Sequence, residues 1–430
     1  MLKLFIALLF SVAAYSGVVQ EQLFVTDSSF LKLASERVEL TIDHVSQDGF
    51  ELYGPKGTKK WLEQIGVDHR VIEHTHHHNK SRSKYPTYEE ITSSLKALAK
   101  LYPHIMSLES IGKSVEGREL WMVKISDNVK KDETEPEFKY ISSMHGNEIT
   151  GRELTQFFIK DLLEGYGNNS RITWLIDNTE LFIMPSMNPD GSKRKRRGNA
   201  NWVDLNRNFP DWTKGEANTW NKRQPETVAV MKLHRKRQFA LSANFHGGAV
   251  VVNYPWDSTY DRHPVDALVK ELSLRYSKEN YPMYTSNRFE DGVTNGADWY
   301  KLHGGMQDWS YFWHNDLQVT VELSAKKWPH YSSIPSFYKD NKESMLVFAE
   351  SIHQGAGFKL KDSAEGKVKI TKLSPDTKSL GSFGFSSGEF YKVLEPGKYR
   401  FDVSAGGEKH SFETQVEFEL NKENGNYTKL

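Results

Sequence analysis

The residues best suited to chemistry lie in the stretch 142–148, SSMHGNE. A β-compatible run, 138–143, leads into it, and apolar residues at helical spacing follow over 149–163. The glycine between them permits a sharp turn. The pattern therefore predicts a strand that delivers His145 and a helix whose start carries Glu148. An imidazole nitrogen and a carboxylate oxygen aimed at one point suit zinc, although these two residues alone fit a plain strand-turn-helix equally well.

A second histidine and a second carboxylate follow far along the chain. His246 comes at the end of a predicted strand, 239–245, in SANFHGG, and Glu322 lies within the apolar strand 318–323. A carboxylate in an apolar strand is costly unless it is paired, lies at the strand end or has a function. Because ligands of open α/β sheets bind beyond the carboxyl ends of the strands, we expect these two residues to meet His145 there. Two histidines, one carboxylate and an open position are the features of a catalytic zinc site.

The elements that must position these residues form three units. Alternating strands and helices over 85–356 predict an α/β domain with a mixed sheet covered on both faces. Residues 17–74 predict a small β-β-α-β unit, either an accessory domain or a pro-segment, and 75–84 a polar linker. The histidines at 74–78 fit a solvated linker or a metal site. Short strands with frequent turns over 357–430 predict a β-sandwich.

The bulk properties restrict the class of protein. Residues 1–16 have the features of a secretory signal peptide, with a lysine at position 3 and an apolar run too short to span a bilayer. Lys+Arg and Asp+Glu both number 56 among 430 residues, so no global charge indicates a nucleic-acid partner. The sequence contains no cysteine, which excludes disulfides and a thiolate mechanism. We expect a secreted or periplasmic monomer without a membrane span.

Six motifs occur in the order HGNE, PSMNPDG, DLNRNFPD, SANFHGG, NGADWYKLHGGMQDW and TVELS. Together they resemble the zinc metallocarboxypeptidases of the N/E (regulatory) subfamily, which includes carboxypeptidases D, E, M and N. The resemblance covers about 85–355, and the β unit behind it is similar to that subfamily's transthyretin-like domain. It implies one zinc ion per chain, with His145, Glu148 and His246 as ligands and Glu322 as general base and acid.

The resemblance also implies how a substrate is held. Asn206 and Arg207 are adjacent donors of the kind that bind a carboxylate, and they match the residues that bind the substrate's terminal carboxylate. Tyr300 matches the tyrosine that closes over bound substrate. Arg197 matches the arginine that polarises the scissile carbonyl, with Arg196 as the alternative in the same run of five basic residues.

Specificity follows from two further matches. Asp257 and Gln307 match the subfamily's pocket for C-terminal lysine or arginine, and a buried carboxylate beside an amide suits such cations. The alternative interpretation of Asp257 is an aspartate of a surface loop. The implied function is zinc-dependent release of the C-terminal residue of peptides and proteins, with a preference for Lys or Arg, by Glu322-assisted attack of zinc-bound water. The alternatives are a cell-wall peptide carboxypeptidase and a non-catalytic peptide-binding scaffold.

Overall fold

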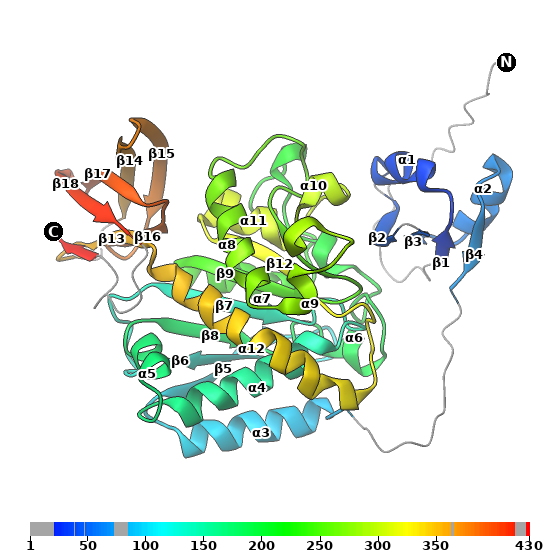
Figure 1. Ribbon diagram of the computed structural model, residues 1–430, viewed down its shortest axis with the longest axis horizontal. Helices are drawn as coiled ribbons and strands as arrows, with labels where there is room; N and C mark the ends of the chain where they lie inside the picture. Colours follow the sequence, from blue (N-terminus) through cyan, green and yellow to red (C-terminus); the bar gives the residue numbers. More distant parts are fainter. Residues whose placement is uncertain (1–20, 38, 47, 73–84, 363–364, 418–426) are drawn as a thin grey trace.

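The computed structural model describes residues 21–37, 39–46, 48–72, 85–362, 365–417 and 427–430. The expected signal peptide at 1–16, the histidine cluster at 74–78 and the expected linker at 75–84 lie outside the described residues. Figure 1 shows a central domain with a small β unit on either side, the N-terminal one in blue and the C-terminal one in orange and red.

The central domain is built on an eight-stranded mixed sheet, which confirms the α/β fold that the sequence predicts. Its strands are β5 (Met106–Lys113), β6 (Glu119–Ile125), β7 (Glu137–Ser142), β8 (Glu180–Met184), β9 (Phe239–His246), β10 (Val250–Tyr254), β11 (Val293–Asn295) and β12 (Leu317–Leu323). Their order across the sheet is β11-β10-β12-β9-β7-β8-β6-β5. The neighbours β12, β9, β7 and β8 run parallel, whereas β10 pairs with β12 and β6 with β8 in antiparallel fashion.

Helices cover both faces of this sheet. One face carries α3 (Tyr88–Leu101), α4 (Thr150–Gly165), α5 (Ser170–Asp177), α8 (Asp266–Lys278) and α12 (Ile334–Glu350). The other carries α7 (Pro225–Lys236) and α11 (Met306–His314). The connections contain the short helices α6 (Pro189–Lys193), α9 (Tyr281–Tyr284) and α10 (Gly296–Trp299). Because both faces are covered, every residue of the central strands β7, β8, β9 and β12 is buried, the polar ones included.

The strand register places three chain segments side by side at one edge of the sheet. Ser142, at the end of β7, pairs with Phe245 of β9. The next residue of β9, His246, pairs with Glu322 of β12. Because β7, β9 and β12 are parallel neighbours, their carboxyl ends open on the same crevice. The register of these strands therefore brings the predicted residues together.

The N-terminal unit contains more structure than the predicted β-β-α-β pattern. The strand β1 (Glu21–Val25) and the helix α1 (Leu31–Ser35) precede β2 (Thr41–Ser46), β3 (Gly49–Gly54), α2 (Thr58–Ile65) and β4 (His69–Val71). The sheet order is β2-β3-β1-β4, so β1 is central and β2 is an edge strand. Five residues are too few for periodicity to reveal a strand, and β1 is stabilised by pairing with both β3 and β4.

The C-terminal unit has two facing sheets, in agreement with the predicted sandwich. Its strands are β13 (Gly355–Lys359), β14 (Gly366–Ser374), β15 (Lys378–Phe385), β16 (Glu389–Val393), β17 (Gly397–Ala405), β18 (Glu408–Val416) and β19 (Tyr427–Lys429). The sheets have the orders β16-β13-β19 and β15-β14-β17-β18 and enclose a core that includes Phe358 and Phe401. Within the described ranges, no helix is both long and apolar enough to cross a membrane.

Candidate active site

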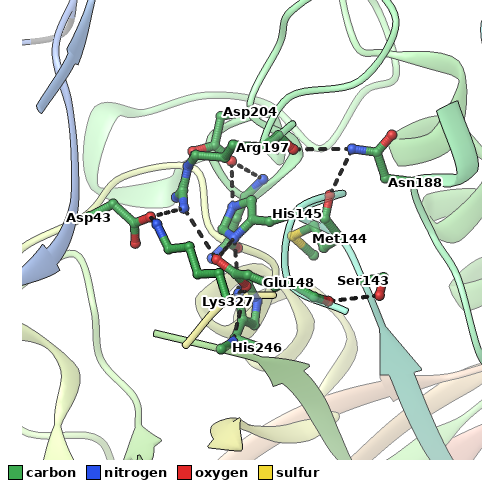
Figure 2. Close-up of polar contacts among 12 residues, drawn as sticks. Asp43, Ser143, Met144, His145, Glu148, Asn188, Arg197, Asp204, His246 and Lys327 are labelled. Carbon is green, nitrogen blue, oxygen red and sulfur yellow. Dashed lines mark hydrogen bonds and ion pairs between the residues drawn. The ribbon is translucent and has the colours of Figure 1, made fainter. Parts of the chain in front are cut away.

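Three predicted ligands, His145, Glu148 and His246, meet at the edge of the sheet and are called the metal corner below (Figure 2). Oε1 of Glu148 lies 3.0 Å from Nδ1 of His145, and Oε2 lies 2.8 Å from Nδ1 of His246. The two Nδ1 atoms are 3.1 Å apart, and all three side chains are buried. Two nitrogens and a carboxylate therefore converge on one point.

The turn between β7 and α4 brings His145 and Glu148 to this point. Ser143 has a positive φ of 51°, which starts the turn. Gly146 approaches the backbone of Gly191 so closely that a Cβ at position 146 would lie 2.1 Å from the carbonyl carbon of that residue. Because no larger side chain fits there, the glycine of HGNE is a steric requirement of the turn.

The ring nitrogens that face away from the metal corner have partners of their own. Nε2 of His145 lies 2.9 Å from Oδ1 of Asp204, and Nε2 of His246 lies 2.8 Å from the side-chain amide of Asn244. An Nε2–H that donates to Asp204 leaves the Nδ1 lone pair free for a metal. Oδ1 of Asn244 has no hydrogen-bond partner among the described residues, and rotating the amide by 180° brings it to Nε2 of His246. Both rings are thus held with Nδ1 toward the shared point.

The donor set of the metal corner fits one zinc ion. Ligand atoms about 2.0–2.1 Å from a tetrahedral zinc lie roughly 3.3 Å apart, close to the separations of 2.8 to 3.1 Å found here. Burial alone would raise the pKa of Glu148, but His145 and His246 hold it well below its usual range. The corner therefore presents an ionised carboxylate and two imidazoles to a cation.

Glu322 lies beside the metal corner, on the strand next to His246. Its side chain is buried, and its Oε2 has no hydrogen-bond partner in the described part of the chain. Burial first, and then the carboxylates of Glu148 and Asp43, raise the pKa of Glu322 well above its usual range. A carboxyl with a raised pKa in this position is able to take a proton from water and pass it on.

The structure separates the two candidate arginines. Arg197 is buried, its Nη1 lies 3.5 Å from Oε1 of Glu148, and its Nε donates to Asp204 at 2.9 Å. Arg196 lies instead over the ring of Trp202, 4.0 Å from the ring centroid. The charge that faces the metal corner is therefore that of Arg197.

Asn206 and Arg207, the pair predicted to bind a terminal carboxylate and called the carboxylate clamp below, come two and three positions after Asp204. The guanidinium of Arg207 lies 3.8 Å from Asp204. The backbone N–H of Met306 donates to Oδ1 of Asn206 at 3.1 Å, which leaves the NH₂ group of that amide to donate elsewhere. Tyr300 packs against the apolar core of the N-terminal unit, and burial raises its pKa well above the usual range.

Asp257 is almost completely buried, with 2% of its surface exposed, so the surface-loop interpretation is wrong. Its Oδ1 accepts a hydrogen bond from Nδ2 of Asn253 at 3.1 Å, and a Cβ on Gly296 would lie 1.8 Å from the same oxygen. The backbone N–H groups of Asp257 and Ser258 donate to Asp308, which fixes the loop. Burial and the Asp308 carboxylate raise the pKa of Asp257 well above its usual range.

Several buried polar atoms near Asp257 lack partners. Within the residues that the structure describes, Nε2 and Oε1 of Gln307 and Oδ1 of Asn253 make no hydrogen bond. We call Asp257, Asn253 and Gln307 the basic pocket. A Cβ on Gly305 would lie 3.6 Å from Oδ2 of Asp257 and 3.5 Å from Oδ1 of Asn206, so the pocket adjoins the carboxylate clamp.

Sequence reasoning missed several residues of the site. Asp204 stands two positions before the clamp asparagine, and Asn244 stands two positions before His246 on the same strand face, so spacing could have indicated both. Asp43, which contacts Arg197 from the N-terminal unit, has no such signal because 154 positions separate the two residues. Its place in the site is a property of the tertiary structure alone.

Comparison with known protein families matches residues 91–344 to the family described as zinc carboxypeptidase. The chain belongs to the zinc carboxypeptidase family. Human carboxypeptidase D is 39% identical in an alignment of 364 residues that covers 77% of this chain. The catalytic chain of human carboxypeptidase N is 35% identical in an alignment of 375 residues that covers 75% of this chain and 81% of the relative. Mouse carboxypeptidase M is 36% identical over 351 residues, so the relatives are those of the N/E subfamily that the motifs resemble.

This zinc carboxypeptidase chain spans about a quarter of the length of carboxypeptidase D, since the match covers 25% of that relative. Among solved structures, carboxypeptidase A from Helicoverpa armigera is similar to the chain with a TM-score of 0.61. The similarity covers 78% of this chain and 97% of that one at 20% identity. It confirms the fold of the family, a mixed sheet between helices.

Proposed function

We propose that this zinc carboxypeptidase family member is an active, zinc-dependent exopeptidase that releases the C-terminal residue of peptides and proteins. The observation that carries the proposal is the convergence of the metal corner with Glu322 and Arg197 at one strand edge. The carboxylate clamp adjoins them and would hold a free chain end, which limits cleavage to the last peptide bond. This complete set of groups favours an enzyme over a peptide-binding scaffold.

The residues of the chain divide the reaction between them. A zinc ion in the metal corner supplies Lewis-acid activation of a water and of the scissile carbonyl. Glu322 takes the proton of the attacking water and passes it to the leaving amine. Arg197 donates to the carbonyl oxygen as negative charge develops there. Asn206 and Arg207 bind the terminal carboxylate, and Tyr300 closes over it.

The basic pocket supports a preference for C-terminal lysine or arginine. A buried acceptor without a partner is costly; Asn253, which donates to the carboxylate of Asp257, has an unpaired oxygen among the described residues, and so does Gln307. A guanidinium or an ammonium would donate to these oxygens. An apolar side chain would leave them unpaired, and so it would bind less well.

The proposed setting of this reaction is extracytoplasmic, secreted or periplasmic, with peptide and protein C-termini as partners of a monomeric chain. The apolar N-terminal stretch supports export. Acidic and basic residues number 56 each, so the net charge gives no reason to propose a nucleic-acid partner.

A panel of peptides that differ only in the last residue (Arg, Lys, Glu or Leu) tests the proposal. The zinc-loaded chain is assayed with and without chelator, and a muropeptide is included for the cell-wall alternative. A protease site inserted between Ile72 and Tyr85 allows the assay before and after cutting, so that the N-terminal unit cannot hide activity. We expect kcat/KM for Arg and Lys to exceed that for Leu by about 10²-fold, with loss in chelator. Failure of the cut chain to hydrolyse any peptide would contradict the proposal.

A further inference from the structure

Three carboxylates meet in the loop that joins β6 to β7, residues 126–136. Asp127, Glu133 and Glu135, called the loop cluster below, each offer an oxygen, and these oxygens all lie within 4.8 Å of one another. Charges of the same sign repel at this separation. Burial, and then the carboxylates of Asp127 and Glu133, raise the pKa of Glu135 to about 9. The loop cluster is therefore costly for the fold unless protons or a cation offset its charge.

Glu135 is the most deeply buried member of the loop cluster, and one of its oxygens has no partner. Only 7% of its surface is exposed, and its Oε2 makes no hydrogen bond with any residue that the structure describes. Asp127 and Glu133 are half-buried, so solvent reaches the cluster beside them. The arrangement offers an ion from solvent both a route of entry and a buried, unpaired ligand.

A neighbouring cluster of carboxylates is already neutralised by cations of the chain. Asp132, Glu137 and Glu180 also bring their oxygens within 4.8 Å of one another. Nη1 of Arg237 lies 2.7 Å from Oδ1 of Asp132 and 3.1 Å from Oε1 of Glu137. Nζ of Lys124 donates to Oε1 of Glu180 at 2.6 Å. Among the described residues, no lysine, arginine or histidine forms such an ion pair with the loop cluster, so its cation must come from outside the chain.

We propose that the loop cluster is a calcium site, with Asp127, Glu133 and Glu135 as ligands, and that the ion ties the end of β6 to the start of β7. The proposal does not depend on hydrolysis at the metal corner. All three ligands are carboxylate oxygens, which suit a hard cation. A calcium ion at about 2.3–2.6 Å from each ligand reaches oxygens up to roughly 5 Å apart, and water completes its coordination.

The expected effect of the ion is on stability. The loop cluster lies at the amino end of β7, whereas His145 follows the carboxyl end of that strand. A strand of six residues spans about 20 Å, so the ion does not touch the metal corner. The chain has no cysteine, and therefore no disulfide holds this loop in place. An ion that binds the folded loop and not the unfolded chain raises the temperature of unfolding.

The experiment adds calcium chloride to the full, zinc-loaded chain in calcium-free buffer. Calorimetric titration should show one calcium ion bound per chain, with a Kd of about 10⁻⁴–10⁻³ M, the range of extracellular calcium modules. At about 10 mM calcium, Tm should rise by roughly 2–6 °C. Absence of saturable binding and of any change in Tm would overturn the proposal. A rise of equal size with magnesium chloride would overturn the assignment to calcium.

Variants of the loop locate the ion. Glu135→Gln keeps the shape of the side chain and removes its charge, so the rise in Tm with calcium should disappear. In calcium-free buffer this variant should unfold at the wild-type temperature or above it, because it removes an unpaired buried charge. Asp127→Asn changes a half-buried ligand instead and should weaken calcium binding at least about tenfold.

The matched control is Asp132→Asn. Asp132 lies in the same loop, but its side chain is 73% exposed and pairs with Arg237. This variant should keep the full rise in Tm with calcium. If Glu135→Gln and Asp127→Asn respond to calcium as the wild type does, the ion binds elsewhere and the loop cluster is not its site.

Discussion

The metal corner and the basic pocket are both buried, but they differ in whether their polar atoms have hydrogen-bond partners. In the metal corner, Asp204 lies behind one histidine ring and Asn244 behind the other. In the basic pocket, both polar atoms of Gln307 lack a hydrogen-bond partner among the residues described here. The ring nitrogens of the corner are held in place as a metal site requires. The unpaired amide of Gln307 fits the proposed binding of a basic side chain.

The carboxylates of the two regions show the same difference. Neighbouring imidazoles hold the pKa of Glu148 well below its usual range despite burial. Burial and the adjacent Asp308 carboxylate raise the pKa of Asp257 well above its usual range. A buried carboxylate in contact with imidazoles stays ionised, whereas one beside another carboxylate holds its proton more tightly. The comparison teaches that the environment, and not burial alone, determines which ligand a buried acid accepts.

The largest effect should come from Glu322, which lies beside the metal corner. Glu322→Gln removes the proton acceptor and keeps the shape, so we expect kcat to fall by about 10²–10⁴-fold while the zinc content remains one per chain. Steady-state kinetics and metal analysis on the cut chain measure both. Glu164→Gln, on the exposed end of α4, is the matched control and should retain full activity. A Glu322→Gln enzyme with normal kcat would remove that residue from the mechanism.

The next largest effect should come from the pocket and should depend on the substrate. Asp257→Ala leaves the guanidinium of an Arg-ended peptide without its charge partner, so kcat/KM for that peptide should fall by about 10²-fold or more. A Leu-ended peptide should be affected much less. A loss of equal size for both peptides would mean that the pocket does not select basic residues.

A smaller effect, on zinc affinity, should follow from changing Asp204, which contacts the histidine ligand His145. Asp204→Asn weakens the hold on the Nε2–H of His145, so zinc affinity should fall by roughly 10–100-fold in a competition titration with a chelator. Asp257→Ala should leave zinc affinity unchanged. If the two variants lose zinc equally, the corner and the pocket are not independent, and the comparison fails.

The smallest effect concerns pH. Because burial and Asp308 raise the pKa of Asp257, a cationic ligand must displace a proton from it. Affinity for an Arg-ended competitive inhibitor should therefore increase with pH below the raised pKa, by at most about tenfold per unit, and level off above it. Calorimetry of the cut chain in two buffers of different ionisation enthalpy measures the released proton. Asp257→Asn should release none.

The sequence predicted the parts of the site that local pattern determines. His145, His246 and Glu322 lie at or near strand ends, where apolar periodicity and a following turn mark their positions. The mixed sheet could be predicted from the alternation of strands and helices. Arg197 could not be separated from Arg196, because adjacent basic residues look alike until the backbone directs one toward Glu148 and the other toward Trp202.

Contacts between distant units could not be predicted in the same way. Asp43 is one of several acidic residues in the N-terminal unit, and its approach to Arg197 and Lys327 depends on how the edge strand β2 lies against the catalytic domain. Such docking has no periodicity and no motif in a single sequence. The strand β1 was missed for a related reason, since its pairing partners lie later in the chain.

The most direct test of the central claim titrates zinc and measures hydrolysis together. The cut chain is depleted of metal, zinc is added back in steps, and release of arginine is followed from one peptide with a free C-terminal carboxylate and from the same peptide with a C-terminal amide. The account expects release from the free acid to rise in proportion to bound zinc up to one ion per chain, with little release from the amide. Hydrolysis that does not depend on zinc, or that is equal for both peptides, would contradict it.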